Sequence, residues 1–173
     1  MKSVAFLKGV NVGGNSKVSM AALKEDMAAK GLGDVVTYLN SGNILCESTL
    51  DRQELARLIH ASIFEVAGID VDVVVKDLDE LIASTRLNPY AGDGSKILFY
   101  YSNDALDAGL SEELKSGKGI VEPFCLHESV LVVQYPNGVG ESKFTTGYID
   151  KKLRTRTTGR NLNTILALIA KCT

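Results

Sequence analysis

The sequence predicts an α+β fold made of two tandem ferredoxin-like halves, each a split βαβ unit, with mainly antiparallel sheets and an extra C-terminal helix. Three observations support this prediction. β-branched and aromatic runs alternate with segments of helical periodicity; the first half reads strand, helix, strand, strand, helix, strand; and the second half repeats most of that order. With 173 residues and 45% hydrophobic content, the chain is long enough to bury a core.

The elements of the first half follow from local signals. Ser19 is an N-cap residue that precedes an apolar helical face, and Ser41-Gly42 is a turn between two β-rich runs. Asp51 followed by Glu54 marks a second helix start, and Gly68 ends that helix. These signals predict strands at residues 4–7, 34–40, 43–47 and 70–76, and helices that start near residues 19 and 51.

A third helix starts at Asp77 and ends before Asn88-Pro89. The glycine-containing stretch 89–95 then predicts a linker, so the predicted lobes are residues 1–88 and 96–173. The second lobe has predicted strands at 96–102, 120–127 and 130–135, and helices at 104–115, 142–154 and from about residue 160. The last helix stands where a strand would be expected, and we expect its apolar stripe to return to the seam between the halves.

Composition excludes several classes of protein. The three cysteines, Cys46, Cys125 and Cys172, are widely spaced, so neither a disulfide framework nor a metal site is predicted, and no cofactor is expected. His127 would share a strand face with Cys125, although cysteines in apolar runs are more often small buried hydrophobes. No segment has the roughly 20 apolar residues of a membrane span, and the first apolar run is too short for a signal peptide. We expect a cytoplasmic protein.

The net charge of -2 is unevenly distributed along the chain. Residues 1–20 carry three lysines and no acid, residues 143–173 carry a net charge of +6, and the residues between them are acidic. The two basic ends therefore predict an anionic partner, and no membrane partner is expected because no segment is long and apolar enough to span a bilayer.

The loop at residues 8–20 is the first candidate site. Its glycines and lysines, with no acid among them, are typical of a loop that presents backbone N–H groups to an anion. It nearly matches a phosphate-binding loop, but Asn15 replaces the lysine of that motif and the helix begins several residues late. The glycines could equally permit only a tight crossover. The candidate ligand-binding residues here are Lys8, Asn11, Gly13, Gly14 and Lys17.

The hairpin tip is the second candidate site. Gly42 supplies the positive φ that a tight turn needs, so a purely structural interpretation is strong. The neutral donors and acceptors of Ser41 and Asn43 lie beside Tyr38, which makes a ligand platform the alternative.

The third candidate is the basic segment at residues 148–164. Arg156 and Arg160 are suited to a bidentate grip on phosphate or carboxylate, and a helix N-terminus there would favour an anion. Thr157, Thr158 or Asn161 is expected to cap that helix. Such a charge run is also typical of a simple solvated face.

Three motifs in the same order resemble the bacterial family called domain of unknown function 1697. They are residues 6–14 with Lys17 and Met20, residues 37–43, and residues 157–164, so the likeness spans nearly the whole chain. The resemblance implies a two-lobed α+β protein with ferredoxin-like halves and brings no activity, cofactor or catalytic residue. The chain departs from the family pattern by inserting Gly159 and by having Leu162 where an aromatic residue is usual.

Together these features favour a binding module for an anionic ligand, a nucleic acid or a phosphorylated metabolite, held between the glycine-rich loop and the basic C-terminal segment. A single-stranded nucleic acid would also use stacking aromatics, for which Tyr38, Tyr100, Tyr101 and Tyr148 are available. The alternative is an enzyme acting on a small phosphorylated or carboxylated substrate, with Tyr38 or His127 moving a proton. A third hypothesis is self-association through an apolar seam or a sheet edge.

Overall fold

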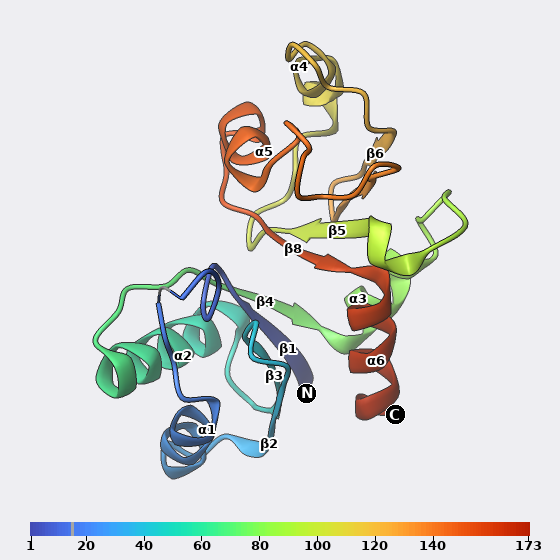
Figure 1. The fold of residues 1–173 in the computed structure, drawn as a ribbon. Coiled ribbons are helices and arrows are strands. Elements are labelled where there is room, and N and C mark those ends of the chain that lie inside the picture. The colour runs from blue at the N-terminus through green and yellow to red at the C-terminus, as the bar shows by residue number, and fades with distance from the viewer. Residues whose placement is uncertain (15) are drawn as a thin grey trace. The chain divides into compact units, whose positions relative to one another are not determined.

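A computed structural model describes residues 1–14 and 16–173 of the protein. The described chain divides into two compact units: Met1–Leu78 with Lys171–Thr173 form the first, and Asp79–Ala170 form the second. This described part contains two four-stranded antiparallel sheets and six α-helices (Figure 1), which confirms the predicted mixture of helices and antiparallel strands. Over the same residues, no helix is both long enough and apolar enough to cross a bilayer.

The sheet of the first unit has the strand order β2-β3-β1-β4. β1 is central because it pairs on both sides, with Ala5 opposite Ile44 in β3 and opposite Val75 in β4. Its apolar composition suits this place, since a central strand is covered on more sides than an edge strand. The elements of the unit are β1 (Lys2–Leu7), α1 (Met20–Ala29), β2 (Gly33–Tyr38), β3 (Asn43–Glu47), α2 (Arg52–Ala67) and β4 (Val73–Asp77).

Two capped helices cover one face of this sheet (Figure 1). The Ser19 side chain accepts a hydrogen bond from the backbone N–H of Ala22 at 3.2 Å and starts α1. Asp51 and Glu54 form a reciprocal capping box that starts α2, so both predicted helix starts are confirmed. The core between helices and sheet includes Ala5, Leu7, Leu23, Met27, Ile44, Leu55, Ile59, Ile63, Val73 and Val75.

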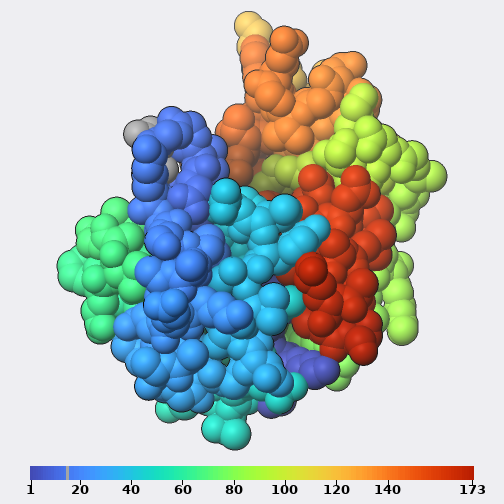
Figure 2. Space-filling model, turned by 60° about the horizontal axis from the view of Figure 1, so that its bottom comes forward, coloured from blue at the N-terminus to red at the C-terminus, as the bar shows by residue number. Residues whose placement is uncertain are grey.

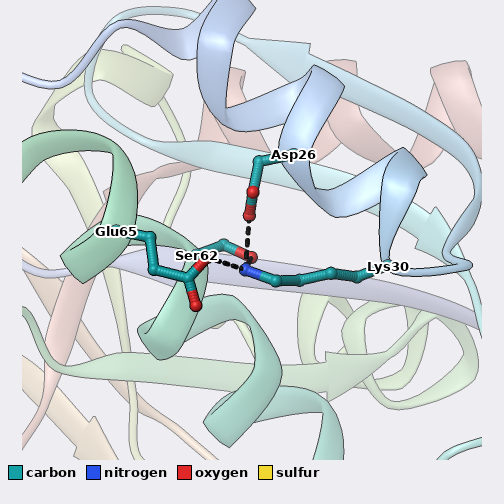
Figure 3. Close-up of polar contacts among 4 residues, drawn as sticks. All are labelled: Asp26, Lys30, Ser62 and Glu65. Carbon is teal, nitrogen blue, oxygen red and sulfur yellow. Dashed lines mark hydrogen bonds and ion pairs between the residues drawn. The ribbon is translucent and has the colours of Figure 1, made fainter.

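Lys30, at the C-terminal end of α1, ties that helix to α2. Its Nζ donates hydrogen bonds to Asp26 Oδ2 at 2.7 Å, Ser62 Oγ at 3.2 Å and Glu65 Oε2 at 2.8 Å (Figure 3). The hydrogen bond from Lys30 lowers the pKa of Asp26, because the ammonium stabilises the ionised carboxylate. The packing of the two helices thus includes a polar contact at its edge.

The sheet of the second unit has the order β6-β7-β5-β8 and carries a core rich in aromatic side chains. In that core the hydroxyls of Tyr100 and Tyr135 are 2.6 Å apart, and the Tyr135 hydroxyl donates to the Phe144 carbonyl oxygen at 2.8 Å. The elements are α3 (Leu78–Thr85), η1 (Gly94–Lys96), β5 (Ile97–Tyr101), η2 (Ala108–Leu110), α4 (Ser111–Lys115), β6 (Phe124–Leu126), β7 (Leu131–Gln134), α5 (Thr146–Leu153), β8 (Thr158–Asn161) and α6 (Leu162–Cys172).

The prediction of a helix from about Arg160 is wrong at its start. Residues Thr158–Asn161 form β8, which pairs antiparallel with β5, and α6 begins only at Leu162. A side chain at Gly159 would place its Cβ 2.6 Å from Tyr100 Cε1, so glycine is what lets β8 lie against β5 there. Pairing with a distant strand therefore decides the conformation of this segment, against its local polar composition.

Three other elements of the second unit are shorter than predicted. The helix expected at 142–154 starts at Thr146, where Thr145 Oγ1 accepts a hydrogen bond from the Tyr148 N–H at 3.2 Å. The strand expected at 120–127 pairs with β7 only over Phe124–Leu126. The helix expected at 104–115 is divided into η2 and α4, next to the predicted interruption at Gly109.

Candidate functional site

The glycine-rich loop and the hairpin tip of the first unit are held together by Asn11. Its Nδ2 donates to the carbonyl oxygen of Asn40 at 2.7 Å and to that of Val18 at 3.1 Å, and its Oδ1 accepts from the Val18 N–H at 2.9 Å. The backbone adds a hydrogen bond of 2.8 Å from Leu7 N–H to the Gly42 carbonyl oxygen. Two of the three predicted candidate stretches therefore meet in one place.

The backbone around this junction is unusual. Of the five non-glycine residues with positive φ in the described chain, three lie here: Asn11 at 54°, Ser16 at 50° and Leu39 at 58°. Asparagine tolerates this region, whereas serine and leucine are uncommon in it. Strained backbone of this kind persists where the surrounding contacts hold it, and it is often found at ligand sites.

A surface hollow lies between the loop and the hairpin tip, and we call it the loop pocket. It has a volume of about 420 Å³. Figure 2 shows the loop, in blue, beside the cyan hairpin segment on the surface of the first unit. The lining residues are Asn11, Gly14, Lys17, Val18, Ser19 and Asn40.

The lining of the loop pocket has an electropositive character. Among the described residues that line it, Lys17 is the one cation and none is a carboxylate. Ser19 is the N-cap of the ten-residue helix α1, so the positive end of that helix dipole borders the hollow. Gly14 has φ 78°, a backbone conformation that favours glycine, and apart from its chain neighbours no described atom lies within 4 Å of where a Cβ would be.

The other predicted residues of the first unit have different surroundings. Lys8 and Gly13 are not among the residues that line the loop pocket. Asn43 is fully buried, and its Nδ2 donates to Tyr38 O at 2.8 Å and Ser41 Oγ at 3.2 Å. The ring of Tyr38 lies 5.0 Å from Lys171 Nζ, a cation–π distance. These side chains stabilise the hairpin and its surroundings. Asn15, which replaces the lysine of the phosphate-binding motif, lies outside the described residues.

The basic C-terminal segment lies in the second unit, where several of its side chains hold the local fold. Arg160 donates to Thr158 Oγ1 at 2.9 Å and to the Gly159 carbonyl oxygen at 2.8 Å. Burial lowers the pKa of Arg160 to about 10, because desolvation disfavours the charged guanidinium. Asn161 Oδ1 accepts a hydrogen bond from the Thr164 N–H at 2.8 Å, which confirms it as the predicted helix cap. Arg156 is exposed.

The aromatic residues proposed for base stacking are mostly unavailable. Tyr100 and Tyr101 are only 2% and 1% exposed. The Tyr148 hydroxyl donates to the Leu114 carbonyl oxygen at 2.6 Å and accepts from the Gly117 N–H at 3.0 Å. Lys152 Nζ lies 5.7 Å from the centroid of the Tyr148 ring, and the Phe144 ring packs against the same ring. Buried rings cannot present a free face to successive bases.

Two residues that line the loop pocket were not among the predicted ligand-binding residues. Ser19 is predicted only as a helix cap, and Asn40 is not among the residues predicted at the hairpin tip. The signal for both is their place in the candidate stretches: Ser19 lies near the end of residues 8–20, and Asn40 lies in the middle of residues 37–43. Their convergence depends on the Asn11 hydrogen bonds, which no local pattern reveals. In the described part of the chain, no three His, Cys, Asp or Glu side chains are grouped so as to hold a metal ion.

Comparison with solved structures places the fold among known ones. The chain is similar to the conserved bacterial protein SP0830 from Streptococcus pneumoniae, with a TM-score of 0.70 and 23% sequence identity over 98% of this chain and 97% of that chain. A likeness at this identity shows the fold alone. No curated protein matches the chain.

The family comparison agrees with the resemblance seen in the sequence motifs. The matching family is described as "Protein of unknown function (DUF1697)", and the match covers residues 1–131, well over half of the chain. The chain therefore belongs to the DUF1697 family.

Proposed function

We propose that the first unit binds a small anionic ligand, a phosphorylated metabolite, in the loop pocket. The observation that carries this proposal is the composition of one hollow: Lys17, Gly14 and the N-terminus of α1 border it, and none of the described residues that line it is a carboxylate. A volume of about 420 Å³ is within the range of small-molecule sites.

The chemistry of these groups suits a phosphate better than a neutral ligand. An ammonium group, backbone N–H groups and the positive end of a helix dipole all favour negative charge. The side-chain amide of Asn11 is already used in holding the loop to the hairpin, so it acts as a support for the pocket. Lys17 is exposed, and we therefore expect modest affinity that falls as salt is added.

A small ligand is favoured over a nucleic acid. Tyr100 and Tyr101 are buried, and the net charge of the protein is -2. Nucleic-acid binders rely on extended basic surfaces and, for single strands, on exposed aromatic faces. The idea that Arg156 and Arg160 contribute to the same site remains a sequence-based prediction.

The proposal is tested by titrating the full-length protein with pyrophosphate at low salt and following backbone amide shifts by NMR. We expect saturable shifts at Gly14 and at residues 17–19. Lys17→Gln should weaken binding about threefold to tenfold, which corresponds to losing one partly screened charge contact. The matched control is Lys24→Gln, which removes an exposed lysine of α1 outside the pocket and changes the net charge equally.

The two variants separate the possible outcomes. If Lys17→Gln and Lys24→Gln weaken pyrophosphate binding equally, the protein attracts anions only through its overall charge and the loop pocket is not a site. If no amide near Gly14 shifts up to millimolar pyrophosphate, the proposal is wrong. A parallel titration with a single-stranded oligonucleotide should give weaker binding per phosphate.

For the architecture, we propose that the two halves are tandem ferredoxin-like lobes, with boundaries at residues 1–88 and 96–173. The matching strand orders of the two antiparallel sheets support this: β2-β3-β1-β4 corresponds position by position to β6-β7-β5-β8. In both, a helical segment joins the first two strands and a helix precedes the fourth. Superposition of the two halves in a crystal structure tests the idea, which fails if the four strands of one half do not overlay those of the other.

A further inference from the structure

A cysteine and a histidine of the second unit lie within hydrogen-bond distance of each other, and the proposed function does not use them. Cys125 lies in β6, where it pairs with Val132 of β7, and His127 follows two residues later. Because side chains alternate along a strand, both point to the same face. Cys125 Sγ and His127 Nε2 are 3.1 Å apart, as the sequence pattern predicts.

The three thiols of the protein have different surroundings. Cys46 is 3% exposed, and burial raises its pKa to about 11. Cys172 is also buried, and burial raises its pKa. Both are therefore poor nucleophiles at neutral pH. Cys125 is only half-buried and has an imidazole within hydrogen-bond distance, the arrangement that activates a thiol.

The surroundings of the pair are partly apolar. Tyr90 is close enough to Cys125 for a thiolate there to raise the pKa of the phenol, in addition to the effect of burial. Tyr90 also lines a hollow of about 300 Å³ together with Pro123 and Phe124, the two residues before Cys125. Lys115, Ile120, Val121 and Glu122 complete the lining of this hollow, so apolar and charged side chains lie near the strand that carries Cys125.

We propose that Cys125, with His127 as its base, is a modification site for soft carbon electrophiles of the α,β-unsaturated carbonyl class. The Sγ–H proton moves to His127 Nε2, and Sγ forms a bond to the β-carbon as the π electrons of the double bond shift to the α-carbon and carbonyl oxygen. The imidazolium then returns the proton to the α-carbon. The net reaction adds S–H across the double bond, so it needs no oxidant or reductant. This site lies in the second unit and does not depend on the loop pocket.

The test uses N-ethylmaleimide, a reagent of this class, on the full-length protein at neutral pH with peptide mapping by mass spectrometry. Cys125 should react at least tenfold faster than Cys46 and Cys172. His127→Gln should slow labelling of Cys125 about tenfold, because it removes the base that takes up the thiol proton. The matched control is His60→Gln, which removes the other histidine, paired with Asp70 in the first unit, and should leave the rate unchanged.

A second measurement does not depend on the folding of the histidine variant. In the wild-type protein, N-ethylmaleimide should label Cys125 faster in the folded state than in urea, because unfolding separates the thiol from His127. Equal labelling of the three cysteines, or labelling of Cys125 that is no faster in the folded protein than in urea, overturns the proposal. Fast labelling of Cys125 that is unchanged in a folded His127→Gln protein also overturns it, because exposure alone would then explain the rate.

Discussion

Replacing Gly42 by alanine tests whether the hairpin tip packs tightly against the glycine-rich loop. Gly42 is buried and has φ 82°. A Cβ built there would lie 2.5 Å from Val10 Cγ2 and 2.7 Å from Leu7 Cβ, closer than real Cβ contacts. Both neighbours belong to the core of the first unit, so neither is free to move away.

The expected loss of stability has two parts. Placing alanine in the left-handed region costs about 1–2 kcal/mol. Forcing a methyl group into a packed core typically costs about 1–3 kcal/mol more. Gly42→Ala should therefore lower the free energy of unfolding by about 2–5 kcal/mol.

Gly68→Ala is the matched control because it measures only the cost of placing alanine in the left-handed region, without the added methyl group meeting the core. Gly68, at the C-terminus of α2, has φ 67° and nothing within 4 Å of a built Cβ. Gly68→Ala should lower the free energy of unfolding by only about 1–2 kcal/mol. Both glycines lie in the first unit, so urea unfolding followed by circular dichroism compares the same transition. With a slope of about 2 kcal/mol per molar urea, the midpoints of the two variants should differ by about 0.5–1.5 M.

Equal midpoints for the two variants would refute the reasoning. They would mean that the loop moves aside for the added methyl group at no cost. The loop pocket would then be a pliable surface rather than a formed site.

The remaining predictions concern stability and pH. Tyr135→Phe should lower the free energy of unfolding by about 1–3 kcal/mol, measured by thermal unfolding, because it leaves a buried carbonyl oxygen without its donor and removes a hydrogen bond to Tyr100. Gly159→Ala should be destabilising by a similar amount, about 1–3 kcal/mol, since its Cβ would meet the Tyr100 ring; a wild-type melting temperature would contradict the packing of β8. Lys30 lowers the pKa of Asp26 in the folded state. The ionised Asp26 carboxylate therefore stabilises the folded protein above pH 3.8, and this stabilisation is lost as pH falls below that value. Urea midpoints of Asp26→Asn should accordingly fall less steeply than wild type between about pH 5 and pH 2.

Several features of the protein were predictable because their causes are local. The Ser19 cap, the Asp51–Glu54 capping box and the Gly42 turn each depend on residues three or fewer positions apart. The Cys125–His127 contact depends on the two-residue period of a strand. Such signals can be read from spacing alone, because the interacting groups are neighbours in the chain.

The candidate site was only partly predictable. Lys17, Gly14 and Asn11 belong to a stretch whose composition already indicated an anion, and they line the loop pocket. Asn40 joins them through a hydrogen bond across 29 residues of sequence. Asn43 and Tyr100 have side chains typical of binding sites, yet both are buried. Composition identifies groups that can bind, and packing decides which of them face solvent.

The amino-acid sequence by itself determined the helix starts, the turns and the alternation of apolar residues, since these arise from hydrogen bonds and side-chain periodicity within a few residues. Only the tertiary structure decided that Thr158–Asn161 is a strand, because its partner β5 lies about 60 residues earlier in the chain and contributes hydrogen bonds that the segment cannot make alone. It likewise decided which polar side chains line a pocket, because burial is a property of the folded surface and not of any one segment.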